Sequence, residues 1–538
     1  SFRVKGDLWD FPFFTARTTR DGEFRIAGRV KDATFDYVPS EPAVNEKPAW
    51  ASPWPALTRV AADVVIDRAS LEIRDGSAQL GNVTLGAVQG GVRNLADRSV
   101  LALDGTVRGP LTEMLRFVNV TPVGQWTGEA LARATASGAA ELKLGLSLPL
   151  YDLSASTVKG NLALAGNDVR ITPDTPLLGG ARARIEFTHK GLTVSGATAK
   201  LLGGDASFDG AMQPDGTLRF SGQGTASAEG LRRAGELGPL ARLASSLTGQ
   251  TGYRASLAFV HGLPEMSITS NLVGLASDLP VPLRKAAETP LPLRYQTTLA
   301  PESLQAGQSA RDTLRLELGS VLQAQYVRDL SGDAPRVLRG GVGINEPAPT
   351  PAAGVHANAT LTTLPADAWE AVSGRLFNSP APGGGAAASA EVAGYLPAQI
   401  ALRVQSLQTG ARQFNRVVVG ASQGEGVWRA NVEAEQFGGY VEYRPARSGA
   451  ANAAGRIYAR LARLSLPKSD VAQVETLLDQ QQPSSVPSLD IVIDDFELRG
   501  KKLGRVEVDA VNRVAGEGRE APADGGLGHR EDARRRRR

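Results

Sequence analysis

The sequence predicts a mainly β protein, a long curled antiparallel sheet that forms an open groove and carries a few short amphipathic helices. Three observations predict this fold. Apolar and polar residues alternate along many short segments, turn-forming residues separate those segments, and only four windows have helical spacing. The 60 Gly and 32 Pro among 538 residues agree with a chain that turns often.

The alternation is clearest where leucines occupy every second position from Leu142 to Leu150. The same pattern recurs at Ile185 and Phe187 and in the segment from Leu314 to Leu318. Because successive side chains of a strand point to opposite faces, each segment has one apolar and one polar face. We therefore expect an antiparallel sheet with one solvated side.

Turn signals separate the predicted strands. Asp-Gly pairs suit tight hairpin turns because both residues tolerate positive φ. They predict turns at Asp21-Gly22, Asp75-Gly76, Asp104-Gly105, Asp209-Gly210 and Pro214-Asp215-Gly216. Stretches rich in Pro or Gly at 39–55, 347–351 and 378–389 are typical of loops or linkers.

Four windows with apolar residues three and four apart predict helices at 111–118, 229–247, 366–377 and 468–481, the second kinked by Pro239. Their wide, similar spacing suggests a loose repeat of many strands followed by one capping helix. The predicted segments are 1–110, with the Pro-rich loop 39–55, then 111–249, 250–377 and 378–513.

The last segment, 514–538, loses the alternation and ends in five Arg residues. Its composition predicts a disordered terminus or a frame-shifted end of the gene. A basic arm for lipid headgroups or nucleic acid is the alternative interpretation.

Composition excludes several classes of protein. The net charge is +3, from 59 basic and 56 acidic residues, and the charges are interspersed, so nucleic acid is not an expected partner. Without Cys the chain has no disulfide scaffold and no thiolate metal site. No apolar window is long enough for a transmembrane helix. The first residues already resemble a strand in mid-sheet, so we expect an internal piece of a longer protein.

Histidine and aspartate positions give no metal or acid–base site. A catalytic zinc ion would need three converging ligands, but the four histidines are far apart in sequence, at His189, His261, His356 and His529. Asp490, Asp494 and Asp495 flank a predicted strand, where we expect them to be solvated; cation binding is the alternative. No metal and no cofactor is therefore predicted.

Serine and glycine motifs do not supply a catalytic site either. Gly420 to Gly424 matches the Gly-x-Ser-x-Gly elbow around Ser422, but a strand pattern follows instead of the required helix, which predicts a hairpin turn. Ser156 and Lys159 match Ser-x-x-Lys between two strands. Gly222 and Gly224 lack the third glycine of a dinucleotide site. With no catalytic set left, we do not expect an enzyme.

The sheet itself is the most informative feature. A sheet of about 30 strands must curl or fold on itself, because open sheets rarely exceed about 10 strands. Scarce aromatic residues argue against a membrane barrel with aromatic girdles and against a filled sandwich. A trough lined by aliphatic side chains would bury alkyl chains at about 0.8 kcal/mol per methylene. The residues expected to line this groove are Leu142, Leu144, Leu146, Leu162, Leu164, Ile185, Phe187, Leu314, Leu316 and Leu318.

One segment resembles a known family. Residues 272–293, LVGLASDLPVPLRKAAETPLPL, are similar to a Gly-Leu-x-Ser-x-Leu-Pro-x-Pro-x-x-Lys turn followed by Pro-Leu in the YhdP-type branch of the AsmA-like proteins of Gram-negative bacteria. The turn is carried here by Gly274, Leu275, Ser277, Leu279, Pro280, Pro282 and Lys285. Segments 9–13, 24–39, 54–73 and 464–480 are also similar to that branch, and the resemblance runs over residues 2–513.

The resemblance implies a protein of the periplasm, anchored in the inner membrane, whose sheet carries phospholipid toward the outer membrane. The implied partners are therefore phospholipid and the two membranes. This chain departs from the family pattern at its start, where the anchor is missing, and at its end, where the tail replaces a sheet region. The alternative hypothesis is a non-enzymatic scaffold or assembly factor for outer-membrane components, using its strand edges.

Overall fold

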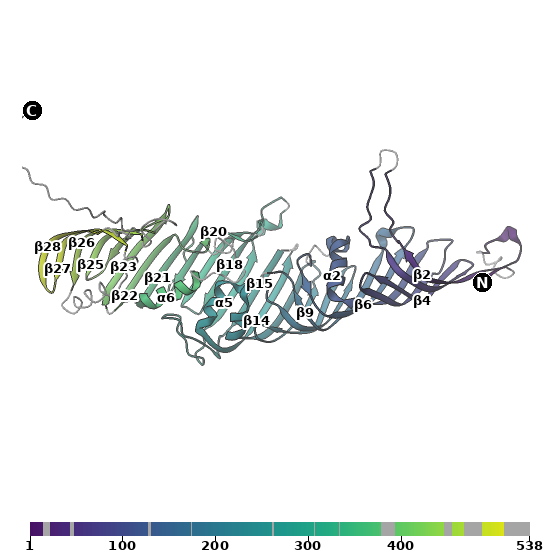
Figure 1. Cartoon of the computed structure of the whole chain (residues 1–538), viewed down its shortest axis with the longest axis horizontal. Helices are drawn as coiled ribbons and strands as arrows, with labels where there is room; N and C mark the ends of the chain where they lie inside the picture. The colour runs from purple at the N-terminus through teal and green to yellow at the C-terminus, as the bar shows by residue number, and fades with distance from the viewer. Residues whose placement is uncertain are drawn as a thin grey trace, which may run out of the picture. The chain divides into compact units, whose positions relative to one another are not determined.

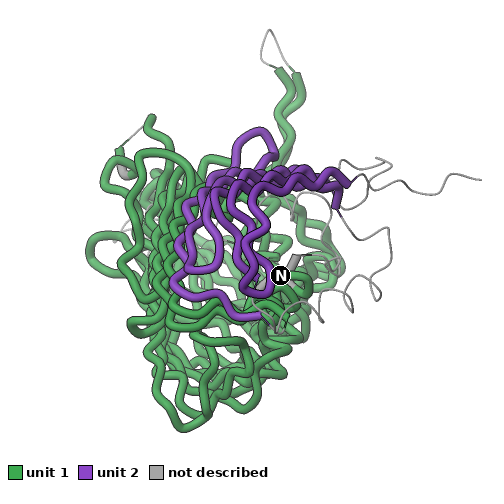
Figure 2. Tube along the Cα trace, turned by 90° about the vertical axis from the view of Figure 1, so that its left-hand side faces the viewer, with its two compact units in different colours: residues 1–410 green, residues 411–538 purple. Residues whose placement is uncertain are grey.

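The computed structural model of the protein describes residues 1–13, 22–43, 48–126, 131–173, 175–260, 263–305, 307–332, 334–377, 393–410, 412–445, 455–466 and 487–510. These residues contain 28 strands and a few short helices. The chain forms two compact units, residues 1–410 and 411–538, which Figure 2 shows in different colours. The division into five segments that the sequence suggested stays a prediction. The predicted helix at 468–481 and the tail lie outside the described residues.

Unit 1 contains the first 22 strands. The strands before the first helix are β1 (Phe2–Lys5), β2 (Glu23–Phe35), β3 (Leu57–Asp67), β4 (Ser70–Leu80), β5 (Val83–Val92) and β6 (Val100–Pro110). The next are β7 (Thr135–Ala136), β8 (Ala139–Pro149), β9 (Thr157–Arg170), β10 (Leu178–Thr188), β11 (Gly191–Leu201), β12 (Gly204–Met212), β13 (Leu218–Ser227) and β14 (Leu247–Val260). The last are β15 (Leu263–Ser270), β16 (Leu275–Ser277), β17 (Leu293–Leu299), β18 (Arg311–Leu318), β19 (Leu322–Asp329), β20 (Arg336–Ile344), β21 (Gly354–Pro365) and β22 (Gln399–Thr409).

These strands pair mainly with their neighbours in the chain, as Figure 1 shows for β4 to β21. The short β7 pairs with β9 and the short β16 pairs with β14. Pairing is antiparallel from β1 to β20 and parallel from β20 through β21 to β22. Seen end-on, the trace of unit 1 curves instead of lying in one plane (Figure 2), as the twist of strands requires. In the described residues β1 and β22 do not pair with each other, so the sheet is open, which confirms the predicted fold class.

Several predicted turns are wrong. Asp75-Gly76 lies inside β4 at a bulge, Asp104-Gly105 lies inside β6, and Asp209-Gly210 lies inside β12. Pro214-Asp215-Gly216 does form the turn between β12 and β13, while Asp21 lies outside the described residues. The misplaced turns have a physical reason, because glycine also occurs within strands where a bulge or a neighbouring side chain leaves no room for a Cβ atom.

The helices agree with the sequence in two of three described windows. Helices α2 (Leu111–Val120) and α6 (Ala366–Phe377) occupy the predicted windows. The single kinked helix predicted at 229–247 is wrong, because this window contains α4 (Ala228–Arg233) and α5 (Pro239–Leu243) with 3-10 turns beside them. Gly238, with φ 55°, and Pro239 at the start of α5 break the helix. A four-residue helix, α3 (Val123–Trp126), follows α2.

Several long connections of unit 1 leave the sheet at the same end of its strands. Strands β2, β6, β13, β15 and β21 run in the same direction, since an even number of antiparallel steps separates them. Each is followed by a long connection. Contacts link these connections: the Trp54 ring packs against Phe117 of α2, α5 contacts α6, and Trp369 Nε1 donates a hydrogen bond to the Val281 carbonyl (3.0 Å).

The two connections that join parallel strands in unit 1, from β20 to β21 and from β21 to β22, contact opposite faces of the sheet. Residues 345–353, between β20 and β21, cross one face so closely that a Cβ atom at Gly341 would lie 1.7 Å from the Pro349 carbonyl oxygen. The connection from β21 to β22 places Tyr395 on the other face, where its ring meets Tyr326 of β19.

Unit 2 contains β23 (Arg412–Gly424), β24 (Val427–Glu433), β25 (Phe437–Arg444), β26 (Arg456–Leu466), β27 (Ser488–Leu498) and β28 (Lys501–Ala510). Its strands pair in chain order, antiparallel except for the parallel pair of β26 and β27. Glu425 and Gly426, both with positive φ, form a two-residue turn between β23 and β24. A hairpin therefore follows the Gly420–Gly424 motif, but the motif itself lies at the end of β23, so the turn predicted on these five residues is misplaced.

Candidate functional site

All ten residues predicted to line a groove lie on one face of the unit 1 sheet. Directly paired residues of neighbouring strands project to the same face. Leu142 pairs with Leu162, Leu162 with Ile185, and Ile185 with Val194. Further pairs extend this row through Gly210, Phe220 and Leu257 to Met266. From Ile268 of the same β15, another row runs through Tyr295 and Leu316 to Ile400. We call this side of the sheet the apolar face.

The apolar face is half-buried between β8 and β10. Leu142, Leu144 and Leu146 are neither fully buried nor freely exposed, and the same holds for Leu162, Leu164, Ile185 and Phe187. Their neighbours on the opposite face, such as Lys143, Arg184 and Glu186, are exposed. Side chains inside a filled sandwich would be packed on both sides. These side chains therefore touch each other across strands and retain surface that is open to solvent or to a ligand.

Aromatic rings lie over glycines on this face, a feature that the sequence analysis missed. Phe187 faces Gly160, Phe220 faces Gly210, and Tyr253 faces Gly224 across neighbouring strands. A Cβ atom at Gly160 or at Gly210 would lie 2.2 Å from the facing ring. Each ring therefore lies across the glycine and close to the sheet, and the glycines inside strands were the sequence signal for it. The face is thus aliphatic and aromatic, not aliphatic alone.

The apolar face is long enough for an acyl chain. Seven steps between paired strands separate β8 from β15, and at about 4.8 Å per step they span about 34 Å. One leaflet of a bilayer is about half of a 30 Å hydrocarbon core, so a phospholipid tail needs about 15 Å. A tail can therefore lie across several strands in this region.

The same face is covered further along, between β18 and β21. Leu314 and Tyr326 are 9% and 8% exposed, and they form a buried cluster with Ala324 and Val355. Tyr395, from the connection before β22, packs on this cluster with its ring 5.0 Å from that of Tyr326. Leu314 and Leu316 were expected to line an open groove, and the structure places Leu314 in a packed cluster and Leu316 against it.

A buried ion pair supports this cluster. Arg328 on β19 and Asp312 on β18 pair directly, and their side chains are 12% and 3% exposed. Arg328 Nε donates to Asp312 Oδ1 (2.9 Å), and its Nη2 donates to Oδ2. Burial opposes protonation of Arg328, but the hydrogen bonds to Asp312 raise its pKa above the ordinary value. Burial raises the pKa of Tyr326 to about 12. None of these residues was singled out from the sequence.

The sequence motifs considered for catalysis lie on strands and turns. Ser422 sits within β23 opposite Arg429, so it is not at the strand-to-helix elbow of a hydrolase. Ser156 Oγ donates to the Leu153 carbonyl (2.6 Å). Asp490 accepts a hydrogen bond from Arg456, and Asp494 pairs with Arg505. Within the described ranges no three His, Asp or Glu side chains are grouped to hold a metal ion, and His261 and His529 fall outside those ranges.

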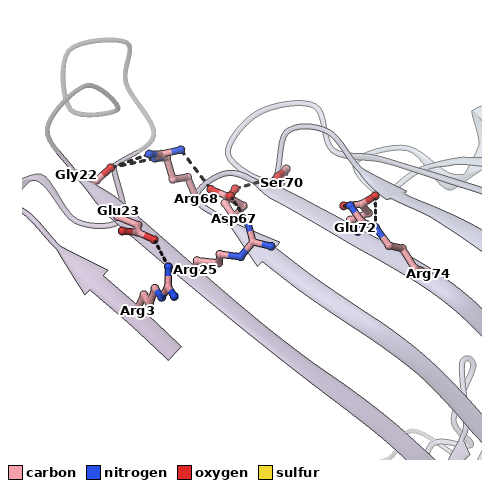
Figure 3. A network of polar contacts seen from close by, with 9 residues as sticks. All are labelled: Arg3, Gly22, Glu23, Arg25, Asp67, Arg68, Ser70, Glu72 and Arg74. Carbon is pink, nitrogen blue, oxygen red and sulfur yellow. Dashed lines mark hydrogen bonds and ion pairs between the residues drawn. The ribbon is translucent and has the colours of Figure 1, made fainter. Parts of the chain in front are cut away.

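Two further features carry no reaction chemistry. Figure 3 shows a network of Arg, Asp and Glu side chains across β1 to β4, in which Arg25 pairs with Asp67 and Glu72 with Arg74 at the surface. Exposed pairs of this kind contribute little to stability. A hollow of about 390 Å³ lies beside the end of α2, and none of the described residues that line it is titratable; these are Pro53, Asn119, Val120, Thr121, Pro122, Gly124 and Ala132.

A comparison with models of protein families shows the family to which the chain belongs. The model of the family described as YhdP protein matches residues 1–519, nearly the whole chain. The chain belongs to the YhdP family. This membership confirms the resemblance seen in the sequence and indicates an AsmA-like protein of the Gram-negative cell envelope. No curated protein and no solved structure is significantly similar to this YhdP-family chain.

The segment that carried the YhdP resemblance forms a tightly held loop. Lys285 is 8% exposed, and its Nζ donates to the carbonyl oxygens of Leu275 (2.6 Å) and Ala286 (2.9 Å). Burial lowers the pKa of this lysine below its ordinary value. Leu275 in turn pairs with Gly249 at the start of β14. These contacts fix the loop to the start of β14, which gives the motif a structural role.

The helices of this YhdP-family chain are short. Across the residues that the structure describes, we find none with the length and apolar character needed to cross a bilayer.

Proposed function

We propose that this protein shields and conducts phospholipid acyl chains along the apolar face of its sheet, as the periplasmic part of a protein anchored in the inner membrane. The acyl chains move toward the outer membrane. The observation that carries the proposal is the half-buried row from Leu142 through Leu162 to Ile185, whose side chains keep part of their surface exposed on three neighbouring strands.

In the proposed mechanism the protein buries the methylene groups of the acyl chain and forms or breaks no covalent bond. Each methylene that leaves water for this face contributes about 0.8 kcal/mol, and the gain has no preferred direction. A tail can therefore shift from one row of side chains to the next while the headgroup stays in water. No catalytic step and no cofactor enters the proposal.

Matched charge substitutions on one strand test it. Leu144→Asp places a carboxylate on the apolar face, whereas Lys143→Asp places the same group on the exposed opposite face of β8. An unpaired charge is unfavourable in apolar surroundings. We expect Leu144→Asp to abolish uptake of a fluorescent phosphatidylethanolamine by the purified protein and Lys143→Asp to retain it. Circular dichroism checks that both variants fold.

Native mass spectrometry provides a second readout, because acyl chains held on the face should travel with the protein. Protein that is free of lipid and fails to take up the fluorescent phospholipid contradicts the proposal. Crosslinking separates it from the scaffold alternative. Acyl chains captured at Leu144 or Ile185 support lipid conduction, and client strands captured at sheet edges support an assembly role.

A further inference from the structure

The apolar face changes character where the connection before β22 crosses it. Tyr395 is held there by three contacts with β19. Its carbonyl oxygen accepts a hydrogen bond from the Tyr326 hydroxyl (3.2 Å), its own hydroxyl accepts from Arg328 Nη1 (3.2 Å), and the two rings pack edge to face. Three residues later, Ala398 N donates to the Val355 carbonyl of β21 (2.9 Å). The backbone that follows Tyr395 is therefore also held against the sheet.

Arg328 is poorly suited to an open lipid path. It lies in the same strand as Tyr326, two residues away, and thus on the same face. Its guanidinium group uses Nε and Nη2 for Asp312 and Nη1 for Tyr395. Moving Tyr395 away would leave a buried N–H group without that acceptor, which is unfavourable. The ion pair therefore opposes displacement of the tyrosine by an alkyl chain, which offers no hydrogen bond in return.

We propose that Tyr395, held by Arg328, is a fixed cover that keeps acyl chains off Leu314 and Tyr326. The inference rests on the proposed function and limits it to a part of the apolar face. Acyl chains occupy the region from β8 to β15 and are excluded from the cluster against which Tyr395 packs. Arg328 is a positioning residue in this arrangement, because it acts through the tyrosine.

Single cysteines test the cover, since the chain contains no cysteine of its own. Leu144→Cys reports the open region and Leu314→Cys the covered one. The measurement is the rate of reaction with N-ethylmaleimide, with and without dioleoylphosphatidylglycerol vesicles. We expect Leu314→Cys to react at least about tenfold more slowly than Leu144→Cys without lipid, because the cluster must open first. Lipid should slow only Leu144→Cys.

Removing the cover should abolish the difference between the two rates. Tyr395→Ala is expected to bring the rate at Leu314→Cys close to that at Leu144→Cys, and to leave Leu144→Cys unchanged. Tyr395→Phe keeps the ring but loses the acceptor for Arg328. It should raise the rate at Leu314→Cys about fivefold, the equivalent of one net hydrogen bond. This milder variant keeps the test valid if Tyr395→Ala fails to fold.

The possible outcomes separate the two proposals. The proposed cover is wrong if the two cysteines react at equal rates without lipid. It is also wrong if neither Tyr395→Ala nor Tyr395→Phe changes the rate at Leu314→Cys. If lipid protects neither cysteine while Leu314→Cys remains slow, the cover stands and lipid conduction fails. If lipid protects Leu314→Cys as strongly as Leu144→Cys in the otherwise unchanged protein, acyl chains reach beneath Tyr395 and the cover is wrong.

Discussion

Two stretches of the apolar face have the same sequence pattern and different surroundings. Leu142, Leu144 and Leu146 alternate along β8 as Leu314, Leu316 and Leu318 do along β18. The leucines of β8 are half-buried, whereas Leu314 is buried in a cluster with Tyr326, against which Tyr395 packs. Alternation therefore decides which face a side chain occupies, and another segment of the chain decides whether that face is open.

Breaking the ion pair should have the largest effect on the covered stretch. Asp312→Leu leaves Arg328 as an uncompensated buried charge and should lower the free energy of unfolding by about 3–5 kcal/mol. Adding Arg328→Met should restore most of it, because apolar residues can replace a buried pair. Urea unfolding followed by circular dichroism measures both. If Asp312→Leu alone has no effect, the pair does not support the cluster.

Truncating the two leucines compares the stretches directly. Leu314→Ala should lower the free energy of unfolding by about 2–5 kcal/mol, as for other buried leucines. Leu144→Ala should lower it by about 1 kcal/mol, because this side chain is partly exposed already. The same urea experiment measures both variants. Equal losses would mean that β8 is packed as tightly as β18.

Alkaline pH should destabilise the covered stretch through Tyr326. Its pKa is about 12 in the folded protein, against 10.0 for the free side chain. The folded state keeps the proton longer, so the stabilisation is complete below pH 10 and is lost as the pH rises to 12. The shift corresponds to about 2–3 kcal/mol. Unfolding of the protein and of Tyr326→Phe between pH 9 and 12 checks it, since the variant should lose less stability over that interval. Equal losses would show that Tyr326 is not the group responsible.

Glycine substitutions extend the comparison to the middle of the face. Gly210→Ala must push the Phe220 ring away from the sheet, because its Cβ atom would lie 2.2 Å from that ring. We expect a loss of about 1–3 kcal/mol and reduced uptake of fluorescent phospholipid. Gly86→Ala in β5 is the control, with no neighbouring atom within 4 Å. It should change stability by less than about 1 kcal/mol and leave uptake unchanged. If the two variants behave alike, the ring over Gly210 has no role.

Much of the fold could be predicted from the sequence because the period of two is a local property. It located the strands, and all ten lining candidates lie on one face. Turns were predicted less well. Asp209-Gly210 has the composition of a hairpin turn, yet Gly210 lies within β12, where the Phe220 ring occupies the space that a Cβ atom would need. No local pattern distinguishes these two uses of glycine.

The candidate site was predicted only in part, because its cover is non-local. Tyr395 follows a Gly- and Ala-rich stretch that is typical of a linker, and it lies far in sequence from Tyr326 and Arg328. Asp312 and Arg328 are ordinary charged residues of alternating strands until pairing brings them together on the apolar face. The spacing of residues along the sequence indicates neither that Asp312 and Arg328 are buried nor that they pair with each other.

The amino-acid sequence by itself determined the strand content, the two-faced character of the sheet and the kinship with the YhdP family. These follow from residue order, since side chains alternate along a strand regardless of what surrounds it. Only the tertiary structure decided where the apolar face is open and where it is closed. Closure depends on a chain crossover and a buried ion pair, and burial is set by segments that meet in space although they are distant in sequence.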